Sequence, residues 1–362
     1  MTAVSQDAHA VLLPICDHLS VEDWLGDFLR EGGRSVLMAS SAEEYAARRI
    51  SDARRAAESA ETIRSFTAAV AAMAAKPVLV AIDAEPTGVQ RLEHLLPALP
   101  DRQQIIRMQD KALARVFSEY AQAARDLGVT LFLGPVVDEI AGTNAWLQGR
   151  ILADDLDAIG TIAVLYTGAV QAAGIIATAK HFPGHSDLAA HPAHEDVTLR
   201  LTREHVQRNL GPFRRLIDAG VGAVMVGPVT VEAIDPANPA ASSRRLVDLL
   251  RHDLGFEGLI VSDDLDLVST MKGRSLGEVA VSSIAAGVEL LLIPGGSAVH
   301  EIGEALTSAA ENERISAAAL AHAAGKVRAL ADGSASRDLR SARRALRLDH
   351  AQQAQEPNEM RL

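Results

Sequence analysis

The chain has 362 residues, of which 48% are hydrophobic and 23% are charged, and its formal net charge at pH 7 is -12. This composition is typical of a soluble globular protein, and the negative charge disfavours electrostatic attraction to nucleic acid or to anionic lipid. The length allows one domain or two, because barrels of alternating strands and helices often exceed about 250 residues around a single core.

The N-terminal segment lacks a basic region, and its apolar run covers only residues 11–15. That run is too short for the core of a signal peptide or for a membrane span. The single cysteine, Cys16, excludes an internal disulfide framework and is interpreted as a small buried apolar residue. We therefore expect a cytoplasmic protein without a membrane or nucleic-acid partner; the sequence gives no indication of its oligomeric state.

Eight short runs of apolar and β-branched residues follow one another along the chain, and each is expected to form a strand. They cover residues 11–15, 35–40, 78–83, 130–135, 174–182, 221–227, 258–264 and 288–294. The segments between them carry helical patterns, such as the apolar stripe formed by Ile63, Phe66, Val70 and Met73. The predicted order is strand and helix in alternation.

Glycines stand between several predicted helices and the strands that follow them, namely Gly128, Gly174, Gly220 and Gly287. This position favours a left-handed helix cap that leads directly into a strand. Parallel strands joined by helices need both faces covered, in a closed barrel or in a doubly wound open sheet. The number of strands and the lack of a glycine-rich dinucleotide fingerprint favour the barrel.

The predicted fold is therefore α/β, a single-domain (β/α)8 barrel of the TIM type over residues 1–330. Residues 331–362 are polar and poor in large apolar side chains, and we expect them to form a partly helical, mobile tail.

Polar residues gather where three of the predicted strands end. The third strand ends in Asp83, with Glu85 and Arg91 just beyond it; the fifth ends in residues 180–185 (KHFPGH) and the seventh in 262–264 (SDD). Taken singly, each residue is compatible with a helix cap, an ion pair or a solvated turn. Because barrels of this kind carry their chemistry at the C-terminal ends of the strands, the group as a whole indicates a functional site.

The run at 179–185 (AKHFPGH) closely resembles the KHFPGHG signature of the bacterial β-N-acetylhexosaminidase branch of glycoside hydrolase family 3. Four further stretches agree in order: 83–92 (DAEPTGVQRL) resembles the family's DQEGGRVQRL, 134–138 (GPVVD) its APVxD, 149–150 (GR) its G-x-R segment and 254–265 (LGFEGLIVSDDL) its LGFDGxxxSDDL. The resemblance covers roughly residues 30–330. It implies a retaining β-glycosidase that acts on a terminal N-acetylhexosamine-type sugar in a small or oligosaccharide glycoside, without a cofactor.

The resemblance also implies residue roles. Five residues would hold the sugar in the −1 subsite, namely Asp83, Arg91, Arg150, Lys180 and His181, while Asp263 would attack the anomeric carbon and form a glycosyl-enzyme. Carboxylate and guanidinium groups suit this task because they make directional hydrogen bonds to sugar hydroxyls. Nearby cations, Lys180 and Arg150, would keep the attacking carboxylate ionised.

The loop after the fifth strand departs from the family pattern, in which an Asp-Ser-His triplet provides the acid/base histidine. Residues 186–194 (SDLAAHPAH) are one residue longer, and Pro192 stands where the aspartate is expected. His194 is the predicted acid/base, because imidazole gains and loses a proton near neutral pH. His185 and His191 are expected to support the loop, and the group that orients His194 stays open among four residues: His191, Asp187, Glu195 and Asp196.

Other rim positions differ too: residues 86–88 (PTG) replace Gly-Gly-Arg, Ser186 replaces the last glycine of the signature, and 227–228 (GP) replaces Ala-His. A retained sugar subsite with an altered loop leaves three hypotheses. The protein hydrolyses an unusual glycoside, transfers the sugar in a biosynthetic tailoring step, or binds sugar as a pseudoenzyme. The aglycone and the acceptor stay open.

Two further chemistries compete with a glycosidase. A zinc site is suggested by four histidines, His181, His185, His191 and His194. However, Pro183 and Gly184 interrupt the helical spacing between His181 and His185, and no metal is predicted. A buried Lys180 with a lowered pKa would suit a Schiff base. Neither alternative explains why Asp83, Arg150 and the SDDL run also follow the family pattern in order.

Overall fold

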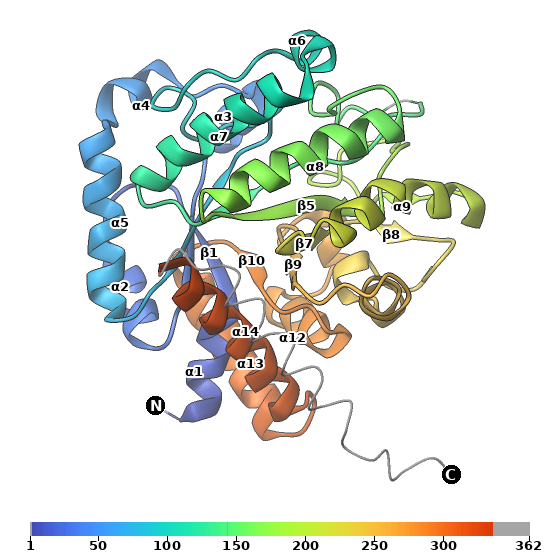
Figure 1. Ribbon diagram of the computed structural model, residues 1–362. Coiled ribbons are helices and arrows are strands. Elements are labelled where there is room, and N and C mark those ends of the chain that lie inside the picture. Colours follow the sequence, from blue (N-terminus) through green and yellow to red (C-terminus); the bar gives the residue numbers. More distant parts are fainter. Residues whose placement is uncertain (1, 143, 336–362) are drawn as a thin grey trace.

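A parallel eight-stranded sheet forms the centre of the protein in a computed structural model that describes residues 2–142 and 144–335 (Figure 1). Its strand order is β10-β1-β2-β3-β4-β5-β7-β9. Each predicted run overlaps one of these strands, and all but β1, which extends one residue further to Cys16, lie entirely within their runs. The bounds are β1 (Leu12–Cys16), β2 (Ser35–Met38), β3 (Leu79–Asp83), β4 (Leu131–Leu133), β5 (Ile176–Phe182), β7 (Ala223–Val226), β9 (Leu259–Ser262) and β10 (Leu291–Ile293). The eight predicted strands are confirmed. A short parallel pair, β6 (Thr198–Leu199) and β8 (Thr230–Val231), lies apart from this sheet and was not predicted.

The sheet closes between its first and last strands. Val261 of β9 forms a parallel bridge with Leu290, just before β10, and the backbone N–H groups of Glu289 and Leu290 both donate to the carbonyl of Ile260. A closed sheet has no exposed edge, so the barrel prediction is confirmed and the open-sheet alternative is excluded.

Helices surround the barrel (Figure 1). Their bounds are α1 (Ala3–Ala10), α2 (Asp23–Arg30), α3 (Ala42–Ala47), α4 (Asp52–Ala57), α5 (Ala60–Ala74), α6 (Arg102–Arg107), α7 (Asp110–Asp126), α8 (Leu156–Ala172), α9 (Arg203–Asp218), α10 (Arg244–Asp248), α11 (Val268–Met271), α12 (Leu276–Ala286), α13 (Ser297–Glu311) and α14 (Ala317–Ala335), with a 3₁₀ turn η1 (Ala240–Ser242) and a π-helical turn η2 (Leu249–Asp253). None of the helices in the described ranges is both long and apolar enough to cross a membrane.

Local sequence signals place the ends of several helices. The four glycines predicted as caps all have positive φ angles, between 78° at Gly220 and 102° at Gly287, as a left-handed cap requires. In the α5 stripe, Ile63, Phe66 and Val70 are buried, but Met73 is 39% exposed because it lies in the last turn of the helix, next to Ala74. The prediction that Met73 belongs to the buried stripe was wrong.

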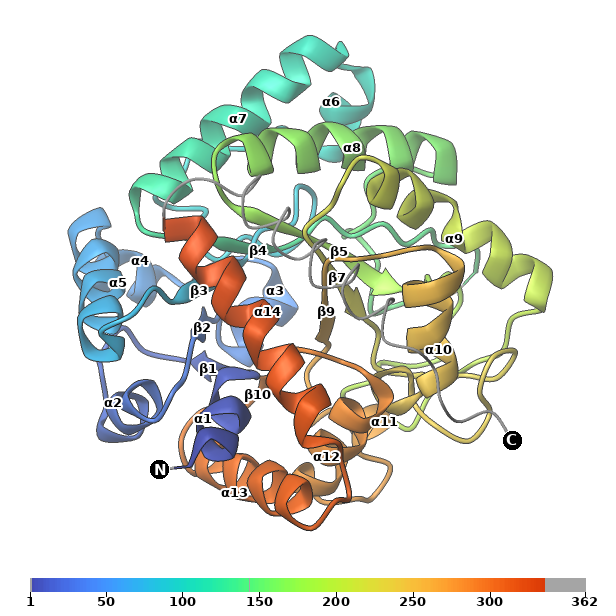
Figure 2. The same cartoon turned by 60° about the horizontal axis from the view of Figure 1, so that its bottom comes forward.

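Helix α14 covers one end of the barrel (Figure 2). Its side chains Val327, Leu330 and Ala331 pack with the apolar residues that fill the barrel interior, among them Leu13 and Leu79 near the start of their strands. This end is opposite to the C-terminal ends of the strands, so α14 closes the barrel on the side away from the predicted site.

The helix also continues past the predicted domain boundary at residue 330. It runs to Ala335, and this last part is held in place because Ala331 and Ser334 are buried and Asp332 pairs with Arg34, 2.6 Å away. The remainder of the predicted tail, residues 336–362, lies outside the described residues.

A buried ion cluster joins α14 to the closure of the barrel. Glu289 accepts a hydrogen bond from the backbone N–H of Ile260 in β9 (2.9 Å), and its carboxylate lies 2.8 Å from both Lys326 of α14 and Arg251. Burial favours the neutral acid, but the two cations outweigh it and hold the pKa of Glu289 below its ordinary value. One carboxylate therefore connects β9, β10 and α14.

Replacing Glu289 with alanine is expected to lower the free energy of unfolding by about 3–5 kcal/mol, because Lys326 would be left buried without its partner. Urea unfolding followed by circular dichroism measures this. The matched control is Glu119→Ala, which breaks the solvent-exposed pair of Arg115 and Glu119 and should leave the midpoint nearly unchanged. Equal effects of the two substitutions would contradict the account.

Candidate active site

A cluster of opposite charges lies where β3 and β5 end. The Nζ atom of Lys180 is 2.7 Å from Glu85 and 3.1 Å from Asp83. The guanidinium of Arg150 grips the same Glu85 through Nη2 (2.6 Å) and Nε (3.0 Å). Glu85 is fully buried, and the two cations are each 2% exposed. The structure thus brings Asp83, Arg150 and Lys180 together, as predicted, around a glutamate to which the sequence analysis assigned no role.

The charges within this cluster act on one another. Burial raises the pKa of Glu85, but Arg150 and Lys180 outweigh that effect and hold it far below its ordinary value. The pKa of Asp83 is raised, mainly by burial. Lys180 lowers this pKa, and Glu85 raises it. Among the described residues, Lys180 forms ion pairs with Glu85 and Asp83, and Arg150 forms one with Glu85, rather than with the predicted nucleophile Asp263.

A second carboxylate, Asp138, fixes the two histidines of the signature. Its Oδ2 accepts hydrogen bonds from the backbone N–H of His181 (3.1 Å) and from Nδ1 of the same ring (2.8 Å), and its Oδ1 accepts from the backbone N–H of His185 (2.7 Å). Burial lowers the pKa of His181 despite the opposing Asp138. The neutral ring therefore carries its proton on Nδ1 and leaves Nε2 as an acceptor, 4.0 Å from Oδ2 of Asp263.

Aromatic contacts complete the surroundings of these histidines. Trp146 packs on both rings, with centroid distances of 4.4 Å to His181 and 5.5 Å to His185. A Cβ atom on Gly227 would lie only 2.0 Å from Cε1 of His185. The glycine at 227, where the family pattern has alanine, thus allows the backbone of the β7 end to approach this ring.

Asp263 follows β9, and its Oδ2 lies near the ring of His181. Its Oδ1 accepts a hydrogen bond from the backbone N–H of Asp264 (2.8 Å), whereas its Oδ2 is buried and has no hydrogen-bond partner among the described residues. Buried carboxylate oxygens are rarely left unpaired, so this atom is a candidate for direct contact with a ligand. Burial, together with the charges of Asp263 and Asp266, raises the pKa of Asp264 well above its ordinary value.

Arg91, predicted to hold the sugar, has other partners in the structure. Its guanidinium makes a bidentate pair with Glu58 (2.7 and 2.8 Å), and its Nε donates to the carbonyl of Ala39 (2.8 Å). Glu58 also pairs with Arg54, which in turn pairs with Glu44. These contacts anchor the segment that carries α3 and α4; a contact between Arg91 and sugar stays a prediction.

The loop that carries the predicted acid/base shows two adjacent imidazoles. His194 is exposed and His191 is half-buried, with their ring centroids 5.0 Å apart. The backbone N–H of Ala193 donates to Nδ1 of His191 (3.2 Å). Burial, together with the charges of His194 and Arg150, lowers the pKa of His191, while Asp263 opposes this shift. Of the four residues considered for orienting His194, His191 is the one in ring contact with it.

The same loop is fastened to the segment that follows β9. The backbone N–H of Ser269 donates to the carbonyl of Pro192 (3.1 Å), and its hydroxyl donates to the carbonyl of Glu195 (2.7 Å). Asp196 pairs with Lys272, 2.6 Å away. Thus α11, just beyond Asp263, holds the loop near the end of β9, and Asp196 is occupied by an ion pair.

The competing chemistries find little support here. Within the described ranges, no three side chains of His, Cys, Asp or Glu converge as a metal site would require. The pKa of Lys180 is raised, because the charges of Glu85 and Asp83 outweigh the effect of burial. A raised pKa is the opposite of what a Schiff-base lysine needs at neutral pH.

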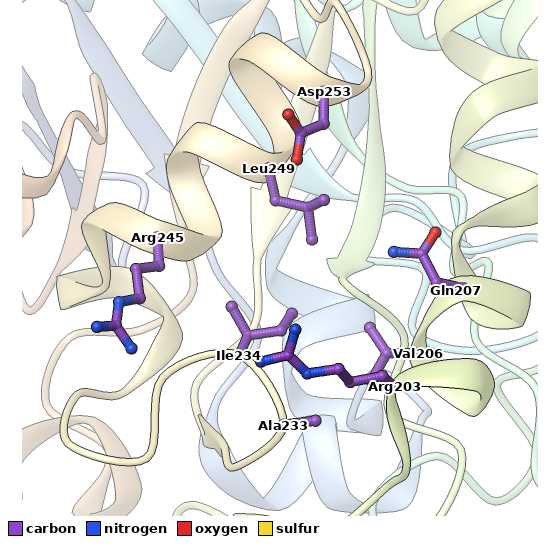
Figure 3. A pocket seen from close by; sticks show the side chains of 8 residues that line it. All are labelled: Arg203, Val206, Gln207, Ala233, Ile234, Arg245, Leu249 and Asp253. Atoms are coloured by element: carbon purple, nitrogen blue, oxygen red, sulfur yellow. The ribbon is translucent and has the colours of Figure 1, made fainter.

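A groove of about 530 Å³ lies elsewhere, between α9 and the α10–η2 segment (Figure 3). It is lined by Arg203, Val206, Gln207, Ala233, Ile234, Arg245, Leu249 and Asp253. None of the predicted site residues is among them, so this groove is separate from the cluster at the strand ends.

Residues 45–330 match the model of the glycosyl hydrolase family 3 N-terminal domain. The chain belongs to glycoside hydrolase family 3. A β-hexosaminidase of Nitrosomonas eutropha is 32% identical over 247 residues, which cover 65% of this chain and 70% of that protein. A β-hexosaminidase of Xanthomonas oryzae pv. oryzae is 30% identical over 266 residues, covering 71% and 78% of the two chains.

Solved structures of family 3 proteins agree with the fold. A β-N-acetylglucosaminidase from a Paenibacillus species superimposes with a TM-score of 0.83 at 25% identity over 92% of this chain, which spans only 63% of that longer chain. A β-N-acetylhexosaminidase from Beutenbergia cavernae gives a TM-score of 0.78 at 25% identity, covering 91% of this chain and 99% of the other. The family indicated by the sequence motifs is confirmed.

The charge cluster predicts a pH dependence of stability. Glu85 is ionised in the folded protein far below the pKa of about 4.3 that it has when unfolded, so its contribution is complete above about pH 5 and declines as the pH falls below that value. Glu85→Gln is expected to cost about 3 kcal/mol at neutral pH, because two buried cations lose their shared anion. Urea unfolding at about pH 7 and pH 3 measures the difference, which should shrink in acid. A loss that does not change with pH would contradict the ion-pair account.

Proposed function

We propose that this family 3 protein is a retaining β-glycosidase that removes a terminal N-acetylhexosamine-type sugar through a glycosyl-enzyme on Asp263. The proposal rests on Oδ2 of Asp263, a buried atom at the C-terminal end of the barrel that lies 4.0 Å from Nε2 of His181 and has no hydrogen-bond partner within residues 2–142 and 144–335. The similarity to a β-hexosaminidase and to a β-N-acetylglucosaminidase supports the choice of sugar.

In the first step, Oδ2 of Asp263 attacks the anomeric carbon while the bond to the aglycone oxygen breaks. The leaving oxygen takes a proton from the His194 imidazolium. In the second step, the neutral imidazole removes a proton from water, which attacks the anomeric carbon and releases Asp263. Two displacements return the sugar with its original β configuration.

The charge cluster supplies the sugar-binding side of the site. Asp83 and Lys180 present an acceptor and a donor at the strand ends, and Arg150 is held rigidly by Glu85. His181 offers Nε2 as an acceptor because Nδ1 carries the proton of the ring and donates a hydrogen bond to Asp138. Fixed donors and acceptors of this kind bind sugar hydroxyls without reorganising during the reaction.

The stereochemical outcome tests the nucleophile. Proton NMR of the first sugar released from an aryl N-acetyl-β-glucosaminide should show the β anomer, and Asp263→Asn should lower kcat by at least about 1000-fold. Asp253→Asn, which alters a carboxylate in the separate groove, should leave the rate unchanged. Release of the α anomer, or an active Asp263→Asn protein, would exclude the double displacement.

The identity of the proton donor has its own test. The ring next to His194 is a second imidazole, that of His191, at a centroid distance of 5.0 Å. We expect His194→Ala to lower kcat/KM about 100-fold for glycosides with poorly acidic leaving groups, and to change it little for the 2,4-dinitrophenyl glycoside. Kinetics over a series of leaving groups measure this, with the exposed His300→Ala as control.

An equal loss for all leaving groups would remove His194 from the role of acid. A protein that binds the sugar but turns over none of the series would instead be a sugar-binding protein.

A further inference from the structure

One aromatic side chain beside Arg150 comes from the segment between β2 and α5. Helices α3 and α4 lie between β2 and α5, on the side where β2 ends, and Tyr45 belongs to α3. The guanidinium carbon of Arg150 lies 5.5 Å from the ring centroid of Tyr45 and 5.4 Å from that of Trp146. Arg150 therefore contacts two aromatic rings while it pairs with Glu85.

The phenol of Tyr45 faces the charges of the site. Burial raises its pKa well above the ordinary value; Arg150 opposes this effect, while Glu85, Asp83 and Asp263 add to it. The hydroxyl therefore stays protonated and available as a donor throughout the working pH range. The side chain is partly buried.

The backbone that carries Tyr45 is held from two sides. The carboxylate of the adjacent Glu44 accepts a hydrogen bond from the backbone N–H of Ser41 at the start of α3. It also accepts from the backbone N–H of Ser51 and from the side chain of Arg54. On the other side, Arg48 donates to the carbonyl of Gln148, two residues before Arg150. Through Glu58, the buried Arg91 braces the same segment. A ring held in this way has little freedom to leave the site.

We propose that Tyr45 determines sugar specificity, its ring forming one wall of the subsite beside Arg150 and its hydroxyl donating a hydrogen bond to a ring hydroxyl of the bound sugar. This inference rests on the proposed glycosidase function. It also gives Arg91 a positioning role, since its pair with Glu58 holds the segment that presents Tyr45.

The test compares Tyr45→Phe with the wild-type protein on 4-methylumbelliferyl N-acetyl-β-glucosaminide. Loss of one hydrogen bond to the substrate should lower kcat/KM about tenfold. The two proteins are then compared on the 3-deoxy, 4-deoxy and 6-deoxy analogues of this glycoside. For the analogue that lacks the contacted hydroxyl, the wild-type and variant values should coincide, because neither complex can form the bond.

The matched control is Tyr120→Phe, which removes a buried phenol hydroxyl that also lacks a partner but lies in the core against Phe132. Its kcat/KM should equal that of the wild type. Thermal melting of both variants reports on folding.

Each outcome separates the claims. An unchanged kcat/KM in Tyr45→Phe would overturn the role of Tyr45 while leaving the glycosidase intact. A similar loss on all deoxy analogues, or a lowered melting temperature, would indicate a structural role and also overturn it. A wild-type protein that does not turn over the parent glycoside would refute the proposed function, and this inference with it.

Discussion

The pairing of Glu85 with both Lys180 and Arg150 is the interaction on which the site depends. Two buried cations in a largely apolar barrel would cost several kcal/mol each without a buried anion to compensate them. Glu85 provides that anion from the segment after β3, Lys180 comes from β5, and Arg150 comes from the connection between β4 and α8. The pairing thus fixes three separate parts of the chain relative to one another.

This pairing also leaves Oδ2 of Asp263 outside the ion pairs of the cluster. Glu85 and Asp83 pair with the cations, and Oδ2 of Asp263 has no hydrogen-bond partner in the described part of the chain, so the proposed attack on carbon breaks no ion pair with Lys180 or Arg150. In the proposed mechanism, the carboxylate of Asp263 stabilises the positive charge that develops at the anomeric centre during glycoside cleavage. The barrel supports this arrangement from its other end, where α14 fills the interior and Glu289 joins the closing strands.

The sequence predicted the barrel well because the information was local. Each strand is a short apolar run, and the glycine caps mark where helices give way to strands. The gathering of Asp83, Lys180 and Asp263 at one end followed from the parallel order. The ion pairs among these residues could not be predicted, because nothing in the run Asp83-Ala84-Glu85 indicates which carboxylate will be buried between two cations. The sequence placed Glu85 among the polar residues at the strand ends but assigned it no role. It also could not predict that Arg91 pairs with Glu58, which is 33 residues away in a segment with no family motif.

The surroundings of Tyr45, His191 and His194 could not be predicted from the sequence either. The polar segment around α3 and α4 has no apolar periodicity that points to a site, and only the fold brings its tyrosine against Arg150. Spacing alone could not decide what stands beside His194; the observed neighbour is a second imidazole.

The most direct test of the central claim is the capture of the glycosyl-enzyme. The protein would be incubated with a 5-fluoro N-acetylglucosaminyl fluoride, whose activated leaving group needs no acid, and its intact mass and peptide map would be recorded. The account predicts a mass increase of one fluorosugar, located on the peptide that contains Asp263 and absent from Asp263→Asn. An adduct on another residue, or turnover without any trapped intermediate, would contradict it.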